Sequence, residues 1–125
     1  MHFNSIEEIN EDLKAGKMVI VVDDEDRENE GDLVVAASFA TPHIINFMAT
    51  HARGLICVPM EEERLIELNL SSMISPHTHD HSYDPYGTAW MMSVDARYGT
   101  TTGISAYDRA RTIEVLINQK TTPED

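Results

Sequence analysis

The sequence contains few basic residues. Nine Lys and Arg stand against 22 Asp and Glu, so the 125 residues carry a formal net charge of −13 at pH 7. A uniformly acidic surface repels both nucleic-acid phosphates and anionic lipid head groups. Long apolar runs are missing too, because LVVAA at 33–37 is far shorter than the roughly 20 residues that cross a bilayer. We therefore expect neither a nucleic-acid nor a membrane partner.

Cysteine is almost absent as well. Cys57 is the only one, which excludes a disulfide within the chain and suits a reducing compartment. The N-terminal segment MHFNSIEEIN has no basic stretch followed by an apolar one, so it is not typical of a secretory signal. We expect a cytoplasmic protein. Its apolar fraction of 42% and charged fraction of 25% are those of a globular chain, and its length predicts a single domain over residues 1–125.

Helices and strands are predicted to alternate along the chain. Helical spacing of apolar residues, behind capping signals at Ser5, Thr41 and Ser105, predicts helices near 6–15, 42–53, 61–68 and 106–117. Short apolar runs predict strands at 18–22, 33–37, 55–58 and 88–94. This alternation favours an α/β (α+β) domain, a layered sandwich of helices on a mixed sheet. No glycine-rich phosphate loop follows a strand, and the tail QKTTPED has too few apolar residues to anchor itself.

The segment after the first predicted strand concentrates negative charge. Residues 23–32 read DDEDRENEGD, and Arg27 is their only cation. Neighbouring carboxylates repel one another and raise each other's pKa, and a divalent cation would relieve that repulsion. Carboxylate oxygens suit magnesium, manganese or calcium. The carboxylates concerned are Asp23, Asp24, Glu25, Asp26, Glu28, Glu30 and Asp32.

Two other interpretations of this segment exist. It could be a solvated acidic loop, but it lies between two apolar strands, and Gly31 predicts a tight turn that brings the carboxylates together. It could also be a calcium loop, since Asp26, Glu28 and Glu30 fall near EF-hand spacing. That second interpretation fails because Ala37 stands where the bidentate glutamate is required.

Four ordered segments resemble a known enzyme family. They are VVDDEDRENEGDLVVAA at 21–37, ATPHIINFMATHARGLICVPM at 40–60, YGTA at 86–89 and SVDARYGTTTGISAYDRARTI at 93–113. Together they are similar to the 3,4-dihydroxy-2-butanone 4-phosphate synthases of riboflavin biosynthesis. The resemblance implies conversion of ribulose 5-phosphate to dihydroxybutanone phosphate and formate, with magnesium, or manganese as the alternative. It also implies a homodimer with composite active sites.

The resemblance further implies roles for the residues of the acidic segment. Arg27 and Asp32 match positions that contact the sugar phosphate. Glu28 matches a metal ligand that also lines the substrate site. Glu30 and Asp23 match further acidic positions of the site. The chemistry requires carboxylates that move protons next to a carbonyl, and Asp32 and Glu30 are the expected catalytic pair.

Outside the acidic segment, the resemblance points to three more residues. Cys57 matches a cysteine near the active site, although it could equally be a small apolar residue on a strand. Thr101 and Thr102 precede a helix start, where hydroxyls and amides bind anions. The residues alone favour a plain turn and cap there, whereas the resemblance implies contact with the substrate.

The sequence also departs from the family pattern. His77, His79 and His81 alternate in a long loop and could hold zinc or nickel, although a polar loop is the favoured interpretation. Family enzymes continue with RPGH and GHTE segments, which supply a metal-binding histidine and an essential glutamate. Neither segment occurs here, so we expect a domain truncated at its C-terminus. The alternative to an enzyme is therefore a metal- or ligand-binding fragment, or a half-site that needs a second chain.

Overall fold

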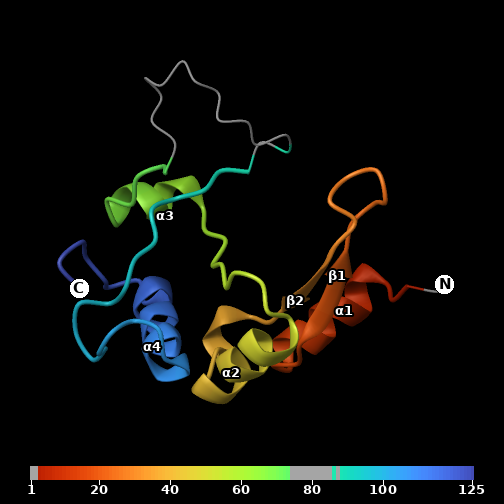
Figure 1. Ribbon diagram of the computed structural model, residues 1–125, viewed down its shortest axis with the longest axis horizontal. Helices are drawn as coiled ribbons and strands as arrows, with labels where there is room; N and C mark the ends of the chain where they lie inside the picture. Colours follow the sequence, from red (N-terminus) through yellow and green to blue (C-terminus); the bar gives the residue numbers. More distant parts are fainter. Residues whose placement is uncertain (1–2, 74–85, 87) are drawn as a thin grey trace.

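The computed structural model describes residues 3–73, 86 and 88–125, and it has a mixed α/β architecture (Figure 1). Two strands form a hairpin near the N-terminus, and helices lie along it and beyond it. The elements in chain order are α1 (Ile6–Lys14), β1 (Val19–Val22), β2 (Gly31–Val34), the 3-10 helix η1 (Ala37–Phe39), α2 (Pro42–His51), α3 (Glu62–Glu67) and α4 (Ala106–Ile117).

The helices begin where the capping signals predict. The Ser5 hydroxyl accepts the backbone N–H of Glu8 at 3.3 Å, and the Glu8 carboxylate accepts the N–H of Ser5 at 2.9 Å. This reciprocal pair is the capping box of α1. Thr41 caps α2, with Pro42 in its first turn, and Ser105 caps α4. Because these side chains satisfy N–H groups that have no partner inside a helix, they fix where each helix starts.

Strands β1 and β2 pair in antiparallel fashion. Val19 lies opposite Val34, and Val22 lies opposite Gly31. The first strand is confirmed within one residue, but the second begins at Gly31 and ends at Val34, earlier than predicted. Although β1 consists of apolar residues, which would suit a buried strand, three of its four residues are exposed.

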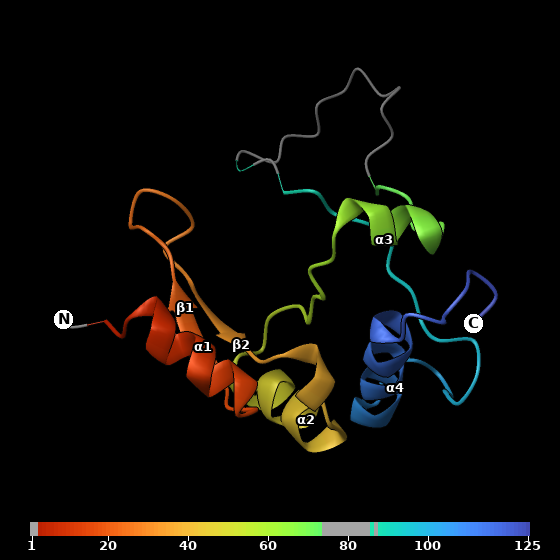
Figure 2. The same cartoon turned by 180° about the vertical axis from the view of Figure 1, so that it is seen from behind.

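The core lies where α2 meets α4. Ile45 of α2 is 1% exposed and packs with Ala110 and Ile113 of α4. Ile56 and Val58 pack against this group from the segment between α2 and α3. Both views place α2 and α4 side by side, with the hairpin beyond α2 and α3 beyond α4 (Figures 1 and 2). The α2–α4 contact therefore joins the N-terminal half of the structure to the C-terminal half.

The predicted α/β fold class is confirmed, but the sheet is smaller than predicted. Residues 55–58 form no strand, and residues 88–94 contribute only one isolated bridge, between Ser72 and Met91. A strand exists only where a neighbour accepts its hydrogen bonds. In the part of the chain that the structure describes, 55–58 have no such neighbour. A two-stranded antiparallel sheet thus replaces the predicted mixed sheet of four.

The C-terminal tail is anchored, contrary to the prediction from its composition. Arg64 of α3 donates from Nη2 to the carbonyl oxygen of Asn118 at 2.8 Å. The Thr121 hydroxyl donates to the carbonyl of Val115 at 2.7 Å. Polar groups, which a count of apolar residues does not register, therefore fasten this segment beside α4.

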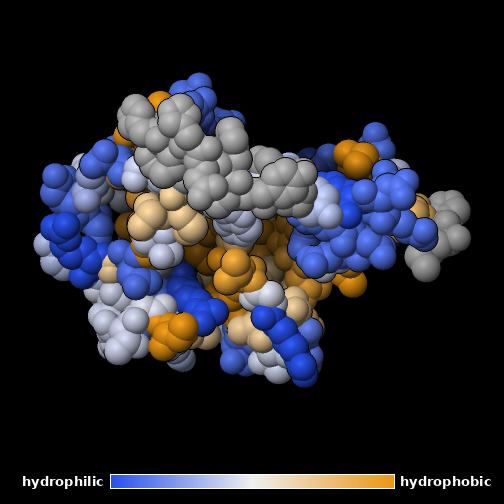
Figure 3. Space-filling view, turned by 45° about the horizontal axis from the view of Figure 1, so that its top comes forward, coloured by the Kyte–Doolittle hydropathy of each residue, from blue (hydrophilic) through white to orange (hydrophobic). Residues whose placement is uncertain are grey.

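Much apolar surface stays in contact with solvent. Figure 3 shows hydrophobic side chains gathered in a hollow between the two halves of the molecule. Leu55 is 82% exposed, and Ile20 and Ile104 are each 69% exposed. Among the described residues, no helix is both long and apolar enough to cross a membrane. The exposed apolar side chains lie on helices as well, since Ile66 of α3 is 71% exposed.

We expect Ile45→Ala to destabilise the chain strongly, because Ile45 is the largest side chain at the α2–α4 contact and is fully buried. Truncation of such a residue typically costs about 2–5 kcal/mol. Urea unfolding followed by circular dichroism measures this change. Ile20→Ala, at an exposed position, is the control and should change the free energy of unfolding by less than about 0.5 kcal/mol. Equal effects of the two variants would contradict this placement of the core.

Candidate functional site

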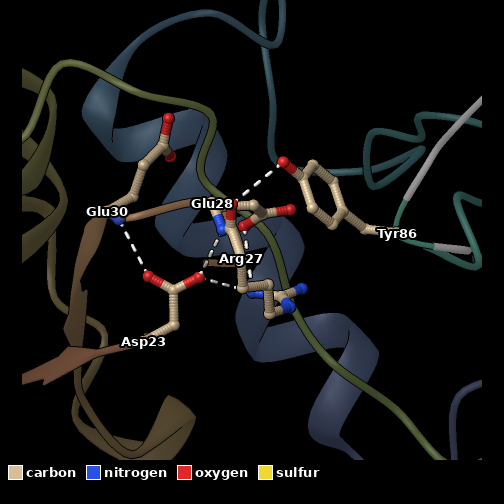
Figure 4. Close-up of polar contacts among 5 residues, drawn as sticks. All are labelled: Asp23, Arg27, Glu28, Glu30 and Tyr86. Atoms are coloured by element: carbon tan, nitrogen blue, oxygen red, sulfur yellow. Dashed lines mark hydrogen bonds and ion pairs between the residues drawn. The ribbon is translucent and has the colours of Figure 1, made fainter. Parts of the chain in front are cut away.

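The acidic segment forms the loop of the β1–β2 hairpin, and Asp23 holds it together from inside (Figure 4). The Asp23 carboxylate accepts the backbone N–H of Glu30 at 2.8 Å and that of Glu28 at 2.9 Å. It also accepts the Arg27 guanidinium at 3.0 Å. One carboxylate therefore fixes three residues on the far side of the loop. The crowded negative charge of the loop suggests a bound cation. At Asp23, however, backbone amides and Arg27 compensate the charge.

These contacts also set the charge state of Asp23. The N–H of Glu30 contributes most, and with the N–H of Glu28 and the Arg27 guanidinium it holds the pKa of Asp23 below its ordinary value of 3.8. The same carboxylate, followed by that of Glu28, raises the pKa of Arg27. Asp23 is therefore an ionised structural acceptor at neutral pH. It is a poor candidate for a group that exchanges protons.

The loop turns at residues 25–28, where the Arg27 N–H donates to the Asp24 carbonyl at 3.0 Å, so the prediction of a tight turn at Gly31 is wrong. Asn29 has a φ of 54°, in the left-handed region that asparagine tolerates better than most residues. Gly31 instead lies in β2, where an added Cβ would stand at 3.6 Å from the Val22 side chain. At that distance a Cβ would make an ordinary van der Waals contact, so neither a turn nor the approach of the two strands requires glycine at this position.

Arg27 projects from the loop with half of its side chain exposed. Its Nη1 atom makes both ion pairs, with Asp23 at 3.0 Å and with Glu28 at 3.1 Å. Tyr86 approaches from elsewhere in the chain. Its hydroxyl donates to the Arg27 carbonyl at 3.0 Å, and its ring centroid lies 5.5 Å from the guanidinium carbon. Tyr86 is thus a site residue that the motif YGTA contains but that the sequence analysis did not single out.

The remaining predicted carboxylates point outward. Glu28 keeps 32% of its side chain exposed beside Arg27. The Glu30 side chain points away from Asp23, which its backbone contacts (Figure 4). Asp32 lies on β2 opposite Val21 and is exposed. Within residues 3–73, 86 and 88–125, no three His, Cys, Asp or Glu side chains come close enough to hold a metal ion. In the described part of the chain, a metal ion would therefore be bound by individual carboxylates and not by a cluster of them.

Cys57 lies within electrostatic reach of Asp32. Partial burial, and then the nearby Asp32 carboxylate, raise the pKa of the Cys57 thiol. The thiol therefore stays protonated at neutral pH, which makes a thiolate nucleophile a poor description of it. The structure does bring together these two predicted residues, which are 25 positions apart in the sequence.

Thr101 and Thr102 lie in the predicted turn at 99–103. A second carboxylate, that of the buried residue Asp108, organises this turn. Asp108 is 4% exposed and accepts the Thr101 N–H at 3.0 Å, the Thr101 hydroxyl at 2.8 Å and the Gly103 N–H at 3.1 Å. These donors, the Thr101 hydroxyl first, lower the pKa of Asp108. Ser105 and Asp108 match the capping-box pattern, so a sequence signal for Asp108 existed, but it was used only to place the helix start.

The turn and the acidic loop lie in opposite halves of the molecule. Figures 1 and 2 both place the loop at 23–30 beyond β1 and the turn at 99–103 beside α4. The Thr101 hydroxyl donates to Asp108, whereas Thr102 is exposed. The described chain therefore does not bring these threonines to Arg27. His77, His79 and His81 lie outside the described residues.

The described residues form an α/β chain with a pinned hairpin loop of carboxylates around one arginine. Comparison with known proteins is more specific. The family model of 3,4-dihydroxy-2-butanone 4-phosphate synthase matches residues 7–125. The chain belongs to this family, as its sequence resemblance predicts.

Several relatives are similar over nearly all of this chain. Riboflavin biosynthesis protein RibBA of Synechocystis sp. is 56% identical over 125 residues, which are 98% of this chain and 22% of that protein. The 3,4-dihydroxy-2-butanone 4-phosphate synthase of Neisseria meningitidis is 51% identical over 124 residues, or 99% and 33%. The chain therefore spans no more than a third of the length of these curated relatives.

Solved structures support the same assignment. A 3,4-dihydroxy-2-butanone 4-phosphate synthase in complex with two magnesium ions is 43% identical, with a TM-score of 0.87 over 97% of this chain and 54% of that one. The synthase of Candida albicans is also 43% identical, with a TM-score of 0.82 over 100% of this chain and 58% of that one. The architecture of the described residues is thus that of a synthase.

We expect the acidic loop to lose its shape in acid as Asp23 is protonated. Because the pKa of Asp23 in the folded chain lies below 3.8, its contribution is complete above about that pH and is lost as the pH falls through the lower value. Amide chemical shifts of Glu28 and Glu30, followed by NMR across the acid range, should report this titration. In Asp23→Asn the titration should vanish. If it persists there, another group controls the loop.

Asp108→Asn should loosen the turn at 99–103, because an amide accepts the three donors less well than a carboxylate does. We expect a lower urea midpoint and shifted amide signals of Thr101 and Gly103. Asp26→Asn is the matched control, since Asp26 lies far from this turn in the hairpin loop, is exposed and makes no hydrogen bond in the described part of the chain. A midpoint that falls equally in both variants would contradict the role of Asp108.

Proposed function

We propose that this chain supplies one side of the active site of a magnesium-dependent synthase of riboflavin biosynthesis. The reaction converts D-ribulose 5-phosphate to L-3,4-dihydroxy-2-butanone 4-phosphate and formate, with manganese as the alternative ion. The observation that carries the proposal is the pinned hairpin loop, where Asp23 orders the backbone and leaves Arg27 and Glu28 beside each other at its surface. Membership of the synthase family supports the assignment of the substrate.

Arg27 is suited to bind the phosphate of the sugar. Both of its ion pairs use Nη1, and within the described residues its Nε and Nη2 atoms make no hydrogen bond. Two adjacent N–H groups on a planar guanidinium match two phosphate oxygens. The contacts to Asp23 and Tyr86 hold the arginine in place, which lowers the entropy lost when a ligand binds.

Glu28 would hold the magnesium ion. Its carboxylate is partly exposed and only Oε2 contacts Arg27, so Oε1 is available as the hard oxygen ligand that magnesium prefers. Magnesium prefers an octahedral shell of ligands, and Glu28 would supply only one of them. Water, substrate oxygens and residues from beyond the described part would supply the rest. When bound, the ion would polarise neighbouring oxygens of the sugar and stabilise negative charge that develops on them.

Glu30 and Asp32 would move protons during the reaction. It starts with removal of a proton next to the carbonyl to give an enediol, and continues with loss of water and a carbon shift. Addition of a water molecule then releases formate, so that no water is lost overall. Both carboxylates are exposed beside Arg27 and Glu28 on the hairpin, where they are accessible to substrate. The Cys57 thiol, protonated because its pKa is raised, would act near Asp32 as a proton donor or a packing group.

Thr101 and Thr102 would contact the substrate from a different chain. Their turn lies in the opposite half of the molecule from the acidic loop (Figures 1 and 2). A homodimer, in which the turn of one subunit faces the acidic loop of the other, would bring both groups to one sugar phosphate. A homodimeric cytoplasmic enzyme is therefore part of the proposal.

A second candidate function is metal or ligand binding without turnover. It is favoured by the absence of any metal-binding group of three side chains among the described residues. Such a fragment would keep Arg27 and Glu28 and would bind magnesium or a sugar phosphate, but it would not release formate. The two functions therefore differ in a single measurable product.

The decisive measurement is formate release from ribulose 5-phosphate by the purified chain with magnesium, followed by proton NMR. We expect any formate signal to disappear in Asp32→Ala, because that carboxylate is assigned to proton transfer. Formate that persists in this variant would contradict its role. Magnesium binding without formate would identify the chain as a binding fragment or half-site.

Glu28→Gln should weaken magnesium binding by about tenfold or more, since the amide oxygen carries no charge and even changes to residues behind a metal ligand often cost about 10–100-fold. Isothermal titration calorimetry measures the change. Glu25→Gln is the matched control, because Glu25 lies in the same loop, is exposed and removes the same charge. Equal losses in the two variants would mean that the loop attracts magnesium only through its overall charge.

A further inference from the structure

Three consecutive threonines lie in the turn before α4, and their hydroxyls have different surroundings. The Thr100 hydroxyl donates to the Ala96 carbonyl at 2.7 Å, and the Thr101 hydroxyl donates to the Asp108 carboxylate at 2.8 Å. Thr102 is exposed, and within the described residues no hydrogen bond involves its side chain. Of the three hydroxyls, that of Thr102 is therefore the one that a ligand reaches without breaking a contact of the turn.

The backbone amides of the turn are already bound to an anion, the carboxylate of Asp108. This residue is 4% exposed and accepts the N–H groups of Thr101 at 3.0 Å and of Gly103 at 3.1 Å. Its own N–H donates to the Ser105 hydroxyl at 3.0 Å. A helix start attracts one negative charge, and a second anion at the same amides would be repelled by the first. The phosphate of a sugar is therefore disfavoured at this turn.

Two further contacts hold the turn in one shape. Gly103 has a φ of 81°, in the region that residues with a side chain rarely adopt. Before the threonines, the Nε–H group of Arg111 donates to the carbonyl of Tyr98 at 3.3 Å and fastens the start of the turn to α4. The backbone on both sides of Thr102 is thus fixed, and Thr102 itself faces solvent.

We propose that Asp108 is a positioning residue of the synthase site: by holding Thr101 and Gly103 inward, it presents the Thr102 hydroxyl to an uncharged hydroxyl group of the sugar. The inference rests on the proposed function, in which this turn meets the substrate, and it narrows the contact there to Thr102. A threonine hydroxyl both donates to and accepts from another hydroxyl. The phosphate of the same substrate is better matched by the guanidinium of Arg27.

The test compares two probes, ribulose 5-phosphate and inorganic phosphate, in NMR titrations of the purified chain. Thr101→Val removes the hydroxyl that Asp108 accepts and keeps the shape of the side chain. We expect this variant to bind ribulose 5-phosphate about two- to tenfold more weakly, the effect of one lost hydrogen bond. Its affinity for inorganic phosphate should stay the same, because that probe has no sugar hydroxyl. Thr101→Ser restores the hydroxyl and should bind both probes like the unchanged chain.

Two more variants separate positioning from general damage to the fold. Thr102→Val, at an exposed position, should show the same selective loss, and so should Asp108→Asn. Thr101→Val combined with Thr102→Val should lose no more affinity than Thr102→Val alone, because both changes act through one contact.

The inference is overturned if Thr101→Val and Asp108→Asn weaken both probes equally or neither, if Thr101→Ser does not restore binding, or if the losses in the double variant add. Failure of the proposed function has a different signature. In that case the unchanged chain itself binds ribulose 5-phosphate no more tightly than inorganic phosphate, or binds neither probe, and the positioning role is overturned with it.

Discussion

Ile45 of α2 packs against the buried face of α4. This small apolar contact determines how the rest of the molecule is arranged. The hairpin with its acidic loop is attached to one side of it, and the turn at 99–103 is attached to the other. Few other side chains are buried, so the relative position of the two candidate binding elements depends on one junction. A core this small explains why so much apolar surface is exposed around it.

Both candidate binding elements use the same physical device. In each, one carboxylate accepts backbone N–H groups of a tight loop: Asp23 in the hairpin loop and Asp108 in the turn before α4. An ionised oxygen forms stronger hydrogen bonds than a neutral one, and the accepted donors in turn keep the pKa of each carboxylate low. Charge and loop shape therefore stabilise each other.

Local signals in the sequence predicted the helices well, because Ser5, Thr41 and Ser105 act on amides within three residues of themselves. The strands at 55–58 and 88–94 were predicted wrongly, because a strand depends on a distant partner that composition does not reveal. For the site, the acidic motif predicted roles for Arg27 and Glu28, and those roles stay predictions. It did not show that Asp23 turns inward, that Asn29 adopts a left-handed conformation, or that Tyr86 contacts Arg27. Those facts depend on the folded backbone.

The inward orientation of Asp23 separates two tasks that the acidic motif combines in one run of residues. The shape of the loop depends on one carboxylate, on Arg27 and on the left-handed Asn29. The outward side chains, such as Asp24 and Glu25, are exposed and take no part in that framework. Selection at the outward positions can therefore respond to ligand binding alone, so the loop can change which small molecule it prefers while its backbone stays the same.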